Sequence, residues 1–329
     1  MLQSQLPDIP VLDVGPGYPK ETLEREAARA HALLDLATKG VPAAALRSLD
    51  AVSRRWLVKW DNAHLDEIDS IAVKLGRPGA YFLSVNYEWG CTCRVAPAPD
   101  GSSARLVRVL DWRTPGLGRN ILAARVAGPA GPFVTLTWPG YTGVLQTMAP
   151  GRFAAALNQA PMRKTVGLLP LDWAVNRGRV WRMPHPTPAH LLRSVAETAP
   201  DFATARAMLI ERPISTPAIY SLAGVKPGET VVIERREREA RVHDGANVAA
   251  NHWQAHGWTG RPRGLESATR ARVMHQVATD LDPRLAWLVP PILNDRTRLV
   301  MIADARAGRL IAQGFEAGRA ATRVLELEV

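Results

Sequence analysis

The most constraining feature of this sequence is a change of pattern at Cys91, one of only two cysteines in the 329 residues. Before it, segments of helical composition are separated by glycine and proline. After it come short runs of apolar residues, partly alternating with polar ones, which are typical of antiparallel strands. We therefore expect an α+β protein in which a small all-helical unit, residues 1–90, precedes a layered domain, residues 91–329.

The expected elements predict two sheets with helices packed on them. In the first unit, helices are expected at residues 21–39, 42–60, 62–76 and 79–89. In the layered domain, helices are expected at residues 190–198, 201–211 and 265–279, the first with Thr187 as its cap and Pro188 in its first turn. Strands are expected at residues 106–112, 121–126, 133–138, 143–147, 153–157, 218–222, 230–234, 240–242, 247–250, 299–303, 309–313 and 323–329.

The net charge of +10, from 41 Lys and Arg against 31 Asp and Glu, raises the question of a nucleic-acid partner. The arginines are scattered along the predicted elements. The densest patch, residues 234–241, alternates in sign like a solvated strand or hairpin surface. Because the sequence also shows no RNA- or DNA-binding motif, we expect no nucleic-acid partner.

The termini and the cysteines predict a soluble cytoplasmic protein. The N-terminal segment lacks the basic and apolar regions of a secretory signal, and no apolar run reaches the ~18–20 residues of a membrane span. Cys91 and Cys93 are too close in sequence for an ordinary disulfide, and two cysteines make no disulfide framework.

The residues after Gly90 fit the needs of a cysteine nucleophile. If the chain is cut between Gly90 and Cys91, the new α-amino group, whose ordinary pKa is about 7.7–8.0, can serve as the base. The amine then needs a carboxylate and the thiolate needs positive charge. Asp111 and Arg108 supply both if their strand pairs with the segment at Cys91, and the turn residues at 97–101 favour such a hairpin.

Two other interpretations of Cys91 remain open at this point. An isolated cysteine is most often an ordinary buried residue, and its charged neighbours then form a simple ion pair at a strand end. Cys91 and Cys93 could also form half of a zinc site with His243 and His252, although the spacing is unlike that of zinc fingers. Cys93 by itself is expected to be a strand residue.

Asn86-Tyr87-Glu88 precedes the pair Cys91-Thr92, and Arg108 and Asp111 follow in an Arg-x-x-Asp pattern. These motifs resemble those of the acid ceramidase and N-acylethanolamine acid amidase branch of the choloylglycine hydrolases. Further motifs follow in the order found in that branch: Gly140-Tyr141-Thr142-Gly143, Pro150-Gly151, Leu157-Asn158, Asn251-His252-Trp253 and Arg270. The resemblance implies an N-terminal-nucleophile hydrolase with an αββα sandwich, made as a precursor that cuts itself before the cysteine.

The resemblance also implies a role for each matched residue. Cys91 is the nucleophile and supplies the base, and the cut separates it from Gly90. Asp111 holds the freed amine, and Arg108 lies beside the thiolate. The remaining implied site residues are Asn251, with Asn158, as stabilisers of the oxyanion, and Arg270, for which Arg272 is the alternative, in the polar shell.

The implied activity is hydrolysis of a linear C–N amide bond through a thioester, with no cofactor and no metal. The implied substrate is a small N-acylated amine with an apolar acyl chain, such as an N-acylethanolamine or a ceramide, and a transient contact with membrane or lipid is possible. The pro-segment, residues 1–90, is expected to stay bound as the second subunit of a heterodimer. Two alternatives remain: an acyltransferase on the same scaffold, and a catalytically inactive basic binding protein.

Overall fold

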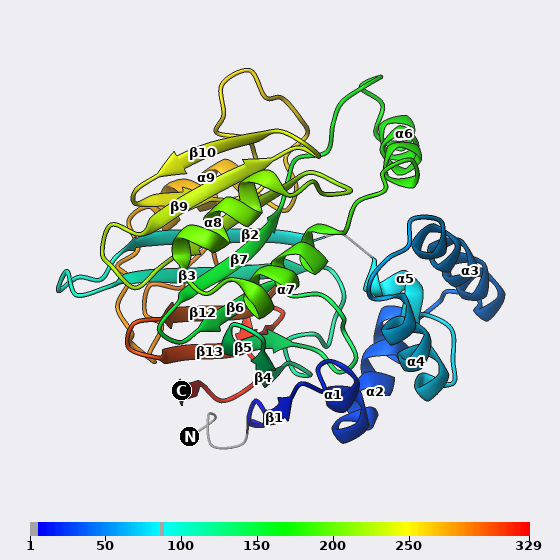
Figure 1. Ribbon diagram of the computed structural model, residues 1–329, viewed down its shortest axis with the longest axis horizontal. Coiled ribbons are helices and arrows are strands. Elements are labelled where there is room, and N and C mark those ends of the chain that lie inside the picture. Colours follow the sequence, from blue (N-terminus) through cyan, green and yellow to red (C-terminus); the bar gives the residue numbers. More distant parts are fainter. Residues whose placement is uncertain (1–5, 86–88) are drawn as a thin grey trace.

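The computed structural model describes residues 6–85 and 89–329, which form two facing sheets with helices on both outer faces (Figure 1). The first sheet has eight strands in the order β1 (Val11–Gly15), β4 (Leu122–Gly128), β5 (Gly131–Thr137), β6 (Gln146–Ala149), β7 (Phe153–Gln159), β8 (Ala218–Ala223), β9 (Thr230–Arg235) and β10 (Ala240–Asp244). The second has seven: β11 (Asn247–Ala249), β2 (Trp89–Pro97), β3 (Ala104–Trp112), β12 (Thr297–Asp304), β13 (Arg309–Glu316), β14 (Arg319–Ala320) and β15 (Leu325–Glu328), which pairs with β13. The segment Asn86-Tyr87-Glu88 lies outside the described residues.

The described helices fall into two groups along the chain. Near the N-terminus lie α1 (Lys20–Arg25), α2 (Ala27–Ala37), α3 (Ala43–Lys59), α4 (Leu65–Leu75) and α5 (Ala80–Ser84). Between the strands lie α6 (Leu169–Trp181), α7 (Pro188–Thr198), α8 (Phe202–Glu211) and α9 (Ser267–Met274). Figure 1 shows α7 and α8 in front of the first sheet and α1–α5 gathered at one side of the sandwich. Within residues 6–85 and 89–329, no helix has both the length and the apolar character to cross a membrane.

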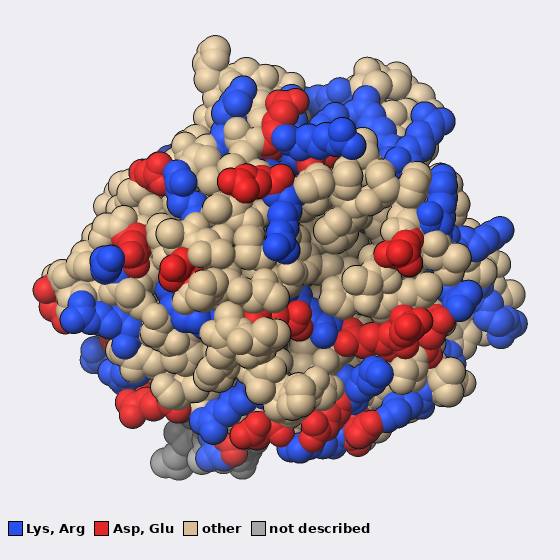
Figure 2. All heavy atoms as spheres, viewed as in Figure 1, with Lys and Arg blue, Asp and Glu red and all other residues tan. Residues whose placement is uncertain are grey.

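The charged side chains are spread over the surface. Figure 2 shows Lys and Arg mixed with Asp and Glu over this face, and gathered most densely at upper right, where α6 lies. The patch at residues 234–241 departs from our expectation, since Glu234 and Arg235 are fully buried. Glu234 accepts hydrogen bonds from backbone N–H groups, including that of Ala255, and Arg235 donates to carbonyls, including that of Arg212. These two charges anchor loops instead of facing water, because backbone groups satisfy them.

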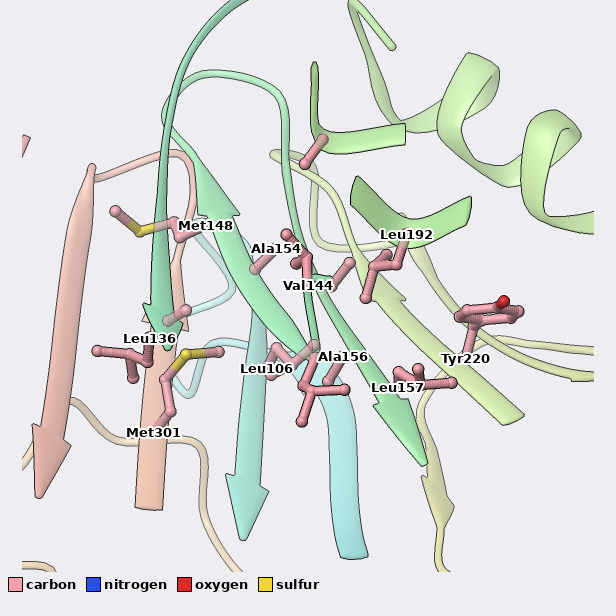
Figure 3. Close-up of a cluster of buried hydrophobic side chains, with 14 of the residues drawn as sticks. Leu106, Leu136, Val144, Met148, Ala154, Ala156, Leu157, Leu192, Tyr220 and Met301 are labelled. Atoms are coloured by element: carbon pink, nitrogen blue, oxygen red, sulfur yellow. The ribbon is translucent and has the colours of Figure 1, made fainter. Parts of the chain in front are cut away.

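The main core lies between the two sheets. Side chains alternate along a strand, so Leu106 and Leu110 of β3 face the first sheet, whereas Val107 and Val109 face away from it. Figure 3 shows Leu106 and Met301 of the second sheet close to side chains of the first sheet. By the same alternation Arg108 faces inward with Leu106 and Leu110, and it is fully buried there.

The outer face of the second sheet is covered by α9 and the chain that follows it, whereas α7 and α8 cover the outer face of the first. Val107 and Val109 pack with Met274 of α9 and with Leu285 and Ile292 of the irregular chain that follows it. We expected a helix over residues 265–279, but α9 is shorter and turns and loops replace the rest. The outer face of the second sheet is therefore covered by one short helix, α9, and by the irregular chain that follows it.

The predicted α7 and α8 are present, and the hydroxyl of Thr187 accepts the hydrogen bond from His190 N (3.1 Å) that a helix cap requires. Helix α6 was not predicted. Its apolar residues form no buried stripe, and Leu169 and Trp173 are about half exposed. The carboxylate of Asp172 holds the approach to α6 by accepting hydrogen bonds from preceding backbone N–H groups, including that of Val166 (2.7 Å).

The prediction that residues 1–90 are all helical is wrong. Residues Val11–Gly15 form β1, which pairs in parallel with β4 at the edge of the first sheet. This proline- and glycine-flanked segment is extended, and the open edge of β4 satisfies its backbone groups. Trp89 and Gly90 also belong to a strand, since they are the first two residues of β2.

The N-terminal helices are fastened to the rest of the molecule by specific contacts. The indole nitrogens of Trp56 on α3 and of Trp60, the residue that follows α3, donate to the carbonyls of Val180 (2.9 Å) and Trp181 (3.0 Å) at the end of α6. Elsewhere Tyr18 donates through its hydroxyl to the carbonyl of Gly143 (2.8 Å). Residues 6–85 thus contact several separate parts of the layered domain.

A buried polar cluster lies between α4 and α7. Arg193 binds Glu67 through two nitrogens, at 2.6 and 3.0 Å, and lies over the Tyr18 ring. Beside this pair, the rings of His64 and His190 have centroids 4.3 Å apart. Burial, with help from Arg193, lowers the pKa of His64 to about 4, and burial and the charges nearby lower the pKa of His190 as well. Both imidazoles are therefore neutral at pH 7.

This cluster predicts an acid-sensitive interface. The folded-state pKa of His64 lies below its ordinary value of 6.5, so the unfolded chain binds more protons and stability falls as pH drops from about 6.5 to about 4. His64→Gln should remove up to about 3 kcal/mol of this pH-dependent loss. Denaturant unfolding of parent and variant at several pH values measures it. If the free energies of unfolding of parent and variant fall equally between pH 6.5 and pH 4, the prediction is contradicted.

Candidate active site

The proposed cut lies at the start of the β2–β3 hairpin. The two strands pair with Gly90 opposite Asp111, Cys91 opposite Leu110 and Cys93 opposite Arg108. The sequence prediction that these strands are neighbours is therefore confirmed. Cys93 is a buried strand residue, also as predicted.

The thiol of Cys91 lies between the two sheets, against the guanidinium of Arg108. Arg108 Nη2 is 3.2 Å from Sγ. The other nitrogens of Arg108 donate to the side-chain oxygens of Asn158 (2.8 Å) and Gln146 (3.0 Å). These partners are neutral amides, so they orient the guanidinium without cancelling its charge.

The backbone of Cys91 is held on both sides of its Cα. Its N–H donates to Asn251 Oδ1 (2.7 Å), and its carbonyl accepts from Arg270 Nη1 (2.7 Å). Arg270 Nη2 also donates to Asn251 Oδ1 (2.9 Å), which links the two contacts. Arg270 comes from α9 and is fully buried. The peptide groups that flank Cys91 are consequently fixed by side chains 160 and 179 positions away.

Asp111 lies on the α9 side of the second sheet and is 2% exposed. Its Oδ1 accepts from the hydroxyl of Thr297 (3.0 Å). Its Oδ2 is 3.3 Å from Arg270 Nη1 but, within the described residues, accepts no hydrogen bond. Burial raises the pKa of Asp111 and the charge of Arg270 opposes this rise. A buried carboxylate oxygen with spare acceptor capacity is suited to an ammonium group.

The electrostatic balance at Cys91 has two opposing parts. Burial raises the pKa of the Cys91 thiol, and the Asp111 carboxylate adds to this rise. The charges of Arg108 and Arg270 lower the pKa, and Arg108 also donates to the sulfur. Because this cluster holds two guanidinium groups and one carboxylate, a thiolate would bring it to neutrality.

Two glycines let a loop press against the proposed cut. A Cβ on Gly90 would lie 3.2 Å from Gly264 Cα, and a Cβ on Gly264 would lie 2.8 Å from Arg270 Nη2. Gly264 also has a positive φ of +68°. Side chains at these positions would push apart the backbone of β2, the loop and the arginine that holds Cys91.

The structure brings together all the residues predicted for the site, and it separates Arg270 from its alternative, since Arg272 is exposed. The carboxamide NH₂ groups of Asn158 and Asn251 donate to backbone carbonyls, those of Ala249 (3.1 Å) and Gln159 (2.8 Å) among them. Their roles as oxyanion stabilisers therefore stay predictions. The side-chain oxygen of Asn251 instead accepts the hydrogen bond from Cys91 N.

Sequence reasoning did not identify three residues that support this site: Gln146, Thr297 and Ser267. Ser267 Oγ accepts the hydrogen bond from Asn251 N (2.8 Å). Thr297 reaches Asp111 only because β12 pairs with β3. No local motif marks these positions, because each acts through a contact between distant parts of the chain.

The residues of the zinc alternative have other partners. His243 Nε2 lies 3.2 Å from Glu234, and His252 Nδ1 lies 2.8 Å from Ser267 Oγ. Among the residues that the structure describes, no three His, Cys, Asp or Glu side chains come together as a metal site.

A cleft of about 210 Å³ opens beside the site. Residues of α3 and α6 line it, together with Val85 just after α5, the end of β7 at Gln159 and the loop residue Arg263. Gln159 connects the cleft to the proposed cut, because its side-chain oxygen accepts from Trp89 N (2.9 Å) and its carbonyl accepts from Asn251 Nδ2. Gln159 therefore lies between the cleft and the strand segment that leads into Cys91.

Comparison with known proteins supports the fold. No protein-family model and no curated protein matches the chain. Among solved structures, an N-acylethanolamine-hydrolyzing acid amidase ortholog from Caenorhabditis elegans matches with a TM-score of 0.51 and 21% identity, over 65% of this chain and 93% of that one. Two variants of conjugated bile acid hydrolase from Clostridium perfringens match with TM-scores of 0.41 and identities of 10% and 11%, over 73% and 72% of this chain and 92% of theirs. The predicted αββα sandwich is confirmed by the two facing sheets with helices on their outer faces, an arrangement shared with the Caenorhabditis elegans structure.

The close approach of Gly264 to Arg270 and Gly90 predicts a large effect of a single methyl group. Gly264→Ala should lose about 1 kcal/mol from the positive φ and a further ~1–3 kcal/mol from steric overlap. Gly257→Ala is the matched control, since Gly257 also has a positive φ, +76°, but faces open space. Denaturant unfolding of both variants gives the difference. Equal losses would show that the loop does not press on the site.

Proposed function

We propose that this protein is a self-cleaving amidase in which Cys91, freed from Gly90, hydrolyses a linear C–N amide bond. The observation that carries the proposal is the arrangement at Cys91, where Arg108 Nη2 lies 3.2 Å from the thiol while Asn251 and Arg270 fix the flanking peptide groups. The shared fold with a solved acid amidase adds to it. An ordinary buried cysteine needs none of these contacts.

Maturation starts with the thiol of Cys91 attacking the carbonyl carbon of Gly90. The C–N bond between the two residues then breaks, the nitrogen of Cys91 takes up a proton, and a thioester joins Gly90 to Sγ. Water hydrolyses this thioester and releases a Gly90 carboxylate and a free Cys91 thiol and amine. Asn251 Oδ1, which already accepts the hydrogen bond from Cys91 N, keeps that nitrogen in place as it becomes an amine.

Turnover repeats the chemistry on a substrate. The α-amino group of Cys91 accepts the thiol proton, the thiolate attacks the substrate carbonyl, and the amine product leaves with that proton. Water then hydrolyses the acyl-thioester. Asp111 Oδ2 is buried, lies 3.3 Å from Arg270 Nη1 and accepts no hydrogen bond from the part of the chain that the structure describes. This oxygen holds the ammonium form of the new terminus. Asn158 and Asn251 act on the oxyanion, and Arg108 and Arg270 favour the thiolate.

The pro-segment, residues 1–90, remains bound after the cut as one subunit of a heterodimer. Its contacts with α6, α7 and β4 do not involve the bond that breaks. The substrate is an N-acylated amine with an apolar acyl chain, of the N-acylethanolamine or ceramide kind. A transient lipid contact suits the loop before α6, where Val166 and Leu168 are 56% and 60% exposed next to Lys164.

The intact mass of the purified protein over time tests maturation. The parent should give two fragments that meet at Gly90 and Cys91, whereas Cys91→Ala should stay a single chain. Cys93→Ala is the control, because Cys93 is equally buried on the same strand but does not follow the cut. A parent that stays uncut and does not react with a thiol-directed acylating probe would refute the amidase and leave a binding protein.

Asp111→Asn tests the second half of the proposal. An asparagine keeps the shape of the side chain but removes the charge that holds the ammonium group, so cleavage and hydrolysis should both slow by roughly 10²-fold or more. Single-turnover acylation of pre-cleaved protein separates the two steps. Unchanged rates in this variant would remove the role assigned to Asp111.

A further inference from the structure

Strands β3 and β12 pair irregularly at Asp111. From Leu299 onward the pairing of β12 with β3 is regular, and it begins with Leu299 opposite Leu110. Continued by one residue, this register would place Arg298 opposite Asp111. The register instead shifts between Thr297 and Leu299, so that Thr297 lies opposite Asp111. Arg298 is therefore the extra residue of a β-bulge.

The bulge changes which side chain Asp111 contacts across the two strands. Opposed residues of an antiparallel pair lie on the same face of the sheet, so a regular register would put the guanidinium of Arg298 beside the carboxylate. In the structure this guanidinium donates to backbone carbonyls, those of Thr114 (2.9 Å) and Asp295 (3.0 Å) among them. The neutral hydroxyl of Thr297 takes the position that a cation would have had.

The turn before β12 orients the hydroxyl of Thr297. Its oxygen accepts a hydrogen bond from Asn294 N (3.0 Å), and Thr297 N donates to the carbonyl of Asn294 (3.0 Å). The hydroxyl proton has two acceptors in reach, Asp111 Oδ1 at 3.0 Å and the carbonyl of Ile292 at 3.4 Å. The carboxylate is both nearer and charged, so it is the stronger acceptor. Thr297 therefore holds one oxygen of Asp111.

Holding Oδ1 of Asp111 also determines where Oδ2 lies. The carboxylate can turn about its Cβ–Cγ bond, so fixing one oxygen fixes the direction of the other. Oδ2 is the oxygen that lies 3.3 Å from Arg270 Nη1. Burial raises the pKa of Asp111, and the charge of Arg270 and the hydrogen bond from Thr297 are among the contacts that oppose this rise. The hydroxyl of Thr297 thus favours the charged carboxylate as well as its orientation.

We propose that Thr297 is a positioning residue of the amidase and that the bulge in β12 brings it to Asp111. Its hydroxyl holds one oxygen of Asp111 and directs the other to the amine that Cys91 gains when the chain is cut. The inference rests on the proposed function for the reaction, but it concerns how the carboxylate is held. Thr297 acts only through Asp111.

The rates of maturation and of single-turnover acylation test this role. Thr297→Val removes the hydroxyl and keeps the shape of the side chain, so both rates should fall roughly 10-fold or more. Thr297→Ser keeps the hydroxyl and should retain most of the rate. Thr279→Val is the matched control and should keep the rates of the parent. Thr279 is also buried, and its hydroxyl donates to the carbonyl of Pro97 (2.9 Å) at the far end of β2 from the cut.

The titration of Asp111 separates positioning from a loss of stability. Cys91→Ala provides an uncut chain, and Asp111→Asn in that background identifies the carboxyl signal of Asp111 by ¹³C NMR. The pKa of Asp111 should be higher with Thr297→Val, because a donor to the charged form lowers the pKa of a carboxyl group. It should stay at the background value with Thr297→Ser and Thr279→Val. An unchanged pKa with Thr297→Val, or equal slowing by Thr297→Val and Thr297→Ser, would overturn the inference.

These outcomes are distinct from those of the proposed function. A parent that cuts itself and is not slowed by Thr297→Val would support the amidase and overturn the inference. A parent that never cuts itself, combined with a pKa of Asp111 that rises with Thr297→Val alone, would refute the amidase and support the hold of Thr297 on Asp111.

Discussion

The structure around Cys91 depends on a buried excess of positive charge. Arg108 and Arg270 are fully buried, and Asp111 is the carboxylate that faces Arg270. An unpaired charge in a protein interior is costly unless neighbouring groups solvate it or an ion of opposite sign forms. Here neutral amides and carbonyls solvate the guanidinium groups, and a thiolate at Cys91 would supply the missing negative charge. The same charge that the fold must accommodate therefore opposes the rise in the pKa of the Cys91 thiol that burial causes.

Different groups contact Cys91 on the two faces of β2. On the face between the sheets, Arg108 contacts the thiol of Cys91. The contact forms because side chains alternate along β2 and β3, which places both residues on this face. From the α9 side, Arg270 and Asn251 hold the peptide groups of Cys91. A strand presents its side chain and its backbone in different directions, so one residue can be fixed through its main chain while its sulfur stays available for chemistry.

Much of this arrangement could be predicted from the sequence, and the failures have physical causes. Cys91, Arg108 and Asp111 lie on two neighbouring strands, so their pairing follows from local pattern and a turn. The place of Arg270 in the site was predicted only from resemblance to a family, because the sequence does not show that an arginine in a helix is buried. Gly264 and Thr297 escaped notice because their contacts depend on tertiary packing. Helix α6 was not predicted because its apolar residues form no buried stripe. Strand β1 was not predicted because it forms by pairing with the edge of β4.

Strand β2 begins two residues before Cys91, and the ring of Trp89 lies with its centroid 5.0 Å from that of Trp112 on β3. Residues 1–90 therefore contribute β1 to the first sheet and the first two residues of β2 to the second. After a cut at Gly90, each sheet would contain residues of both fragments. The native state could be reached intramolecularly only once, before the cut, and renaturation afterwards would be a bimolecular process whose yield depends on protein concentration. The mature protein would owe its persistence to slow unfolding.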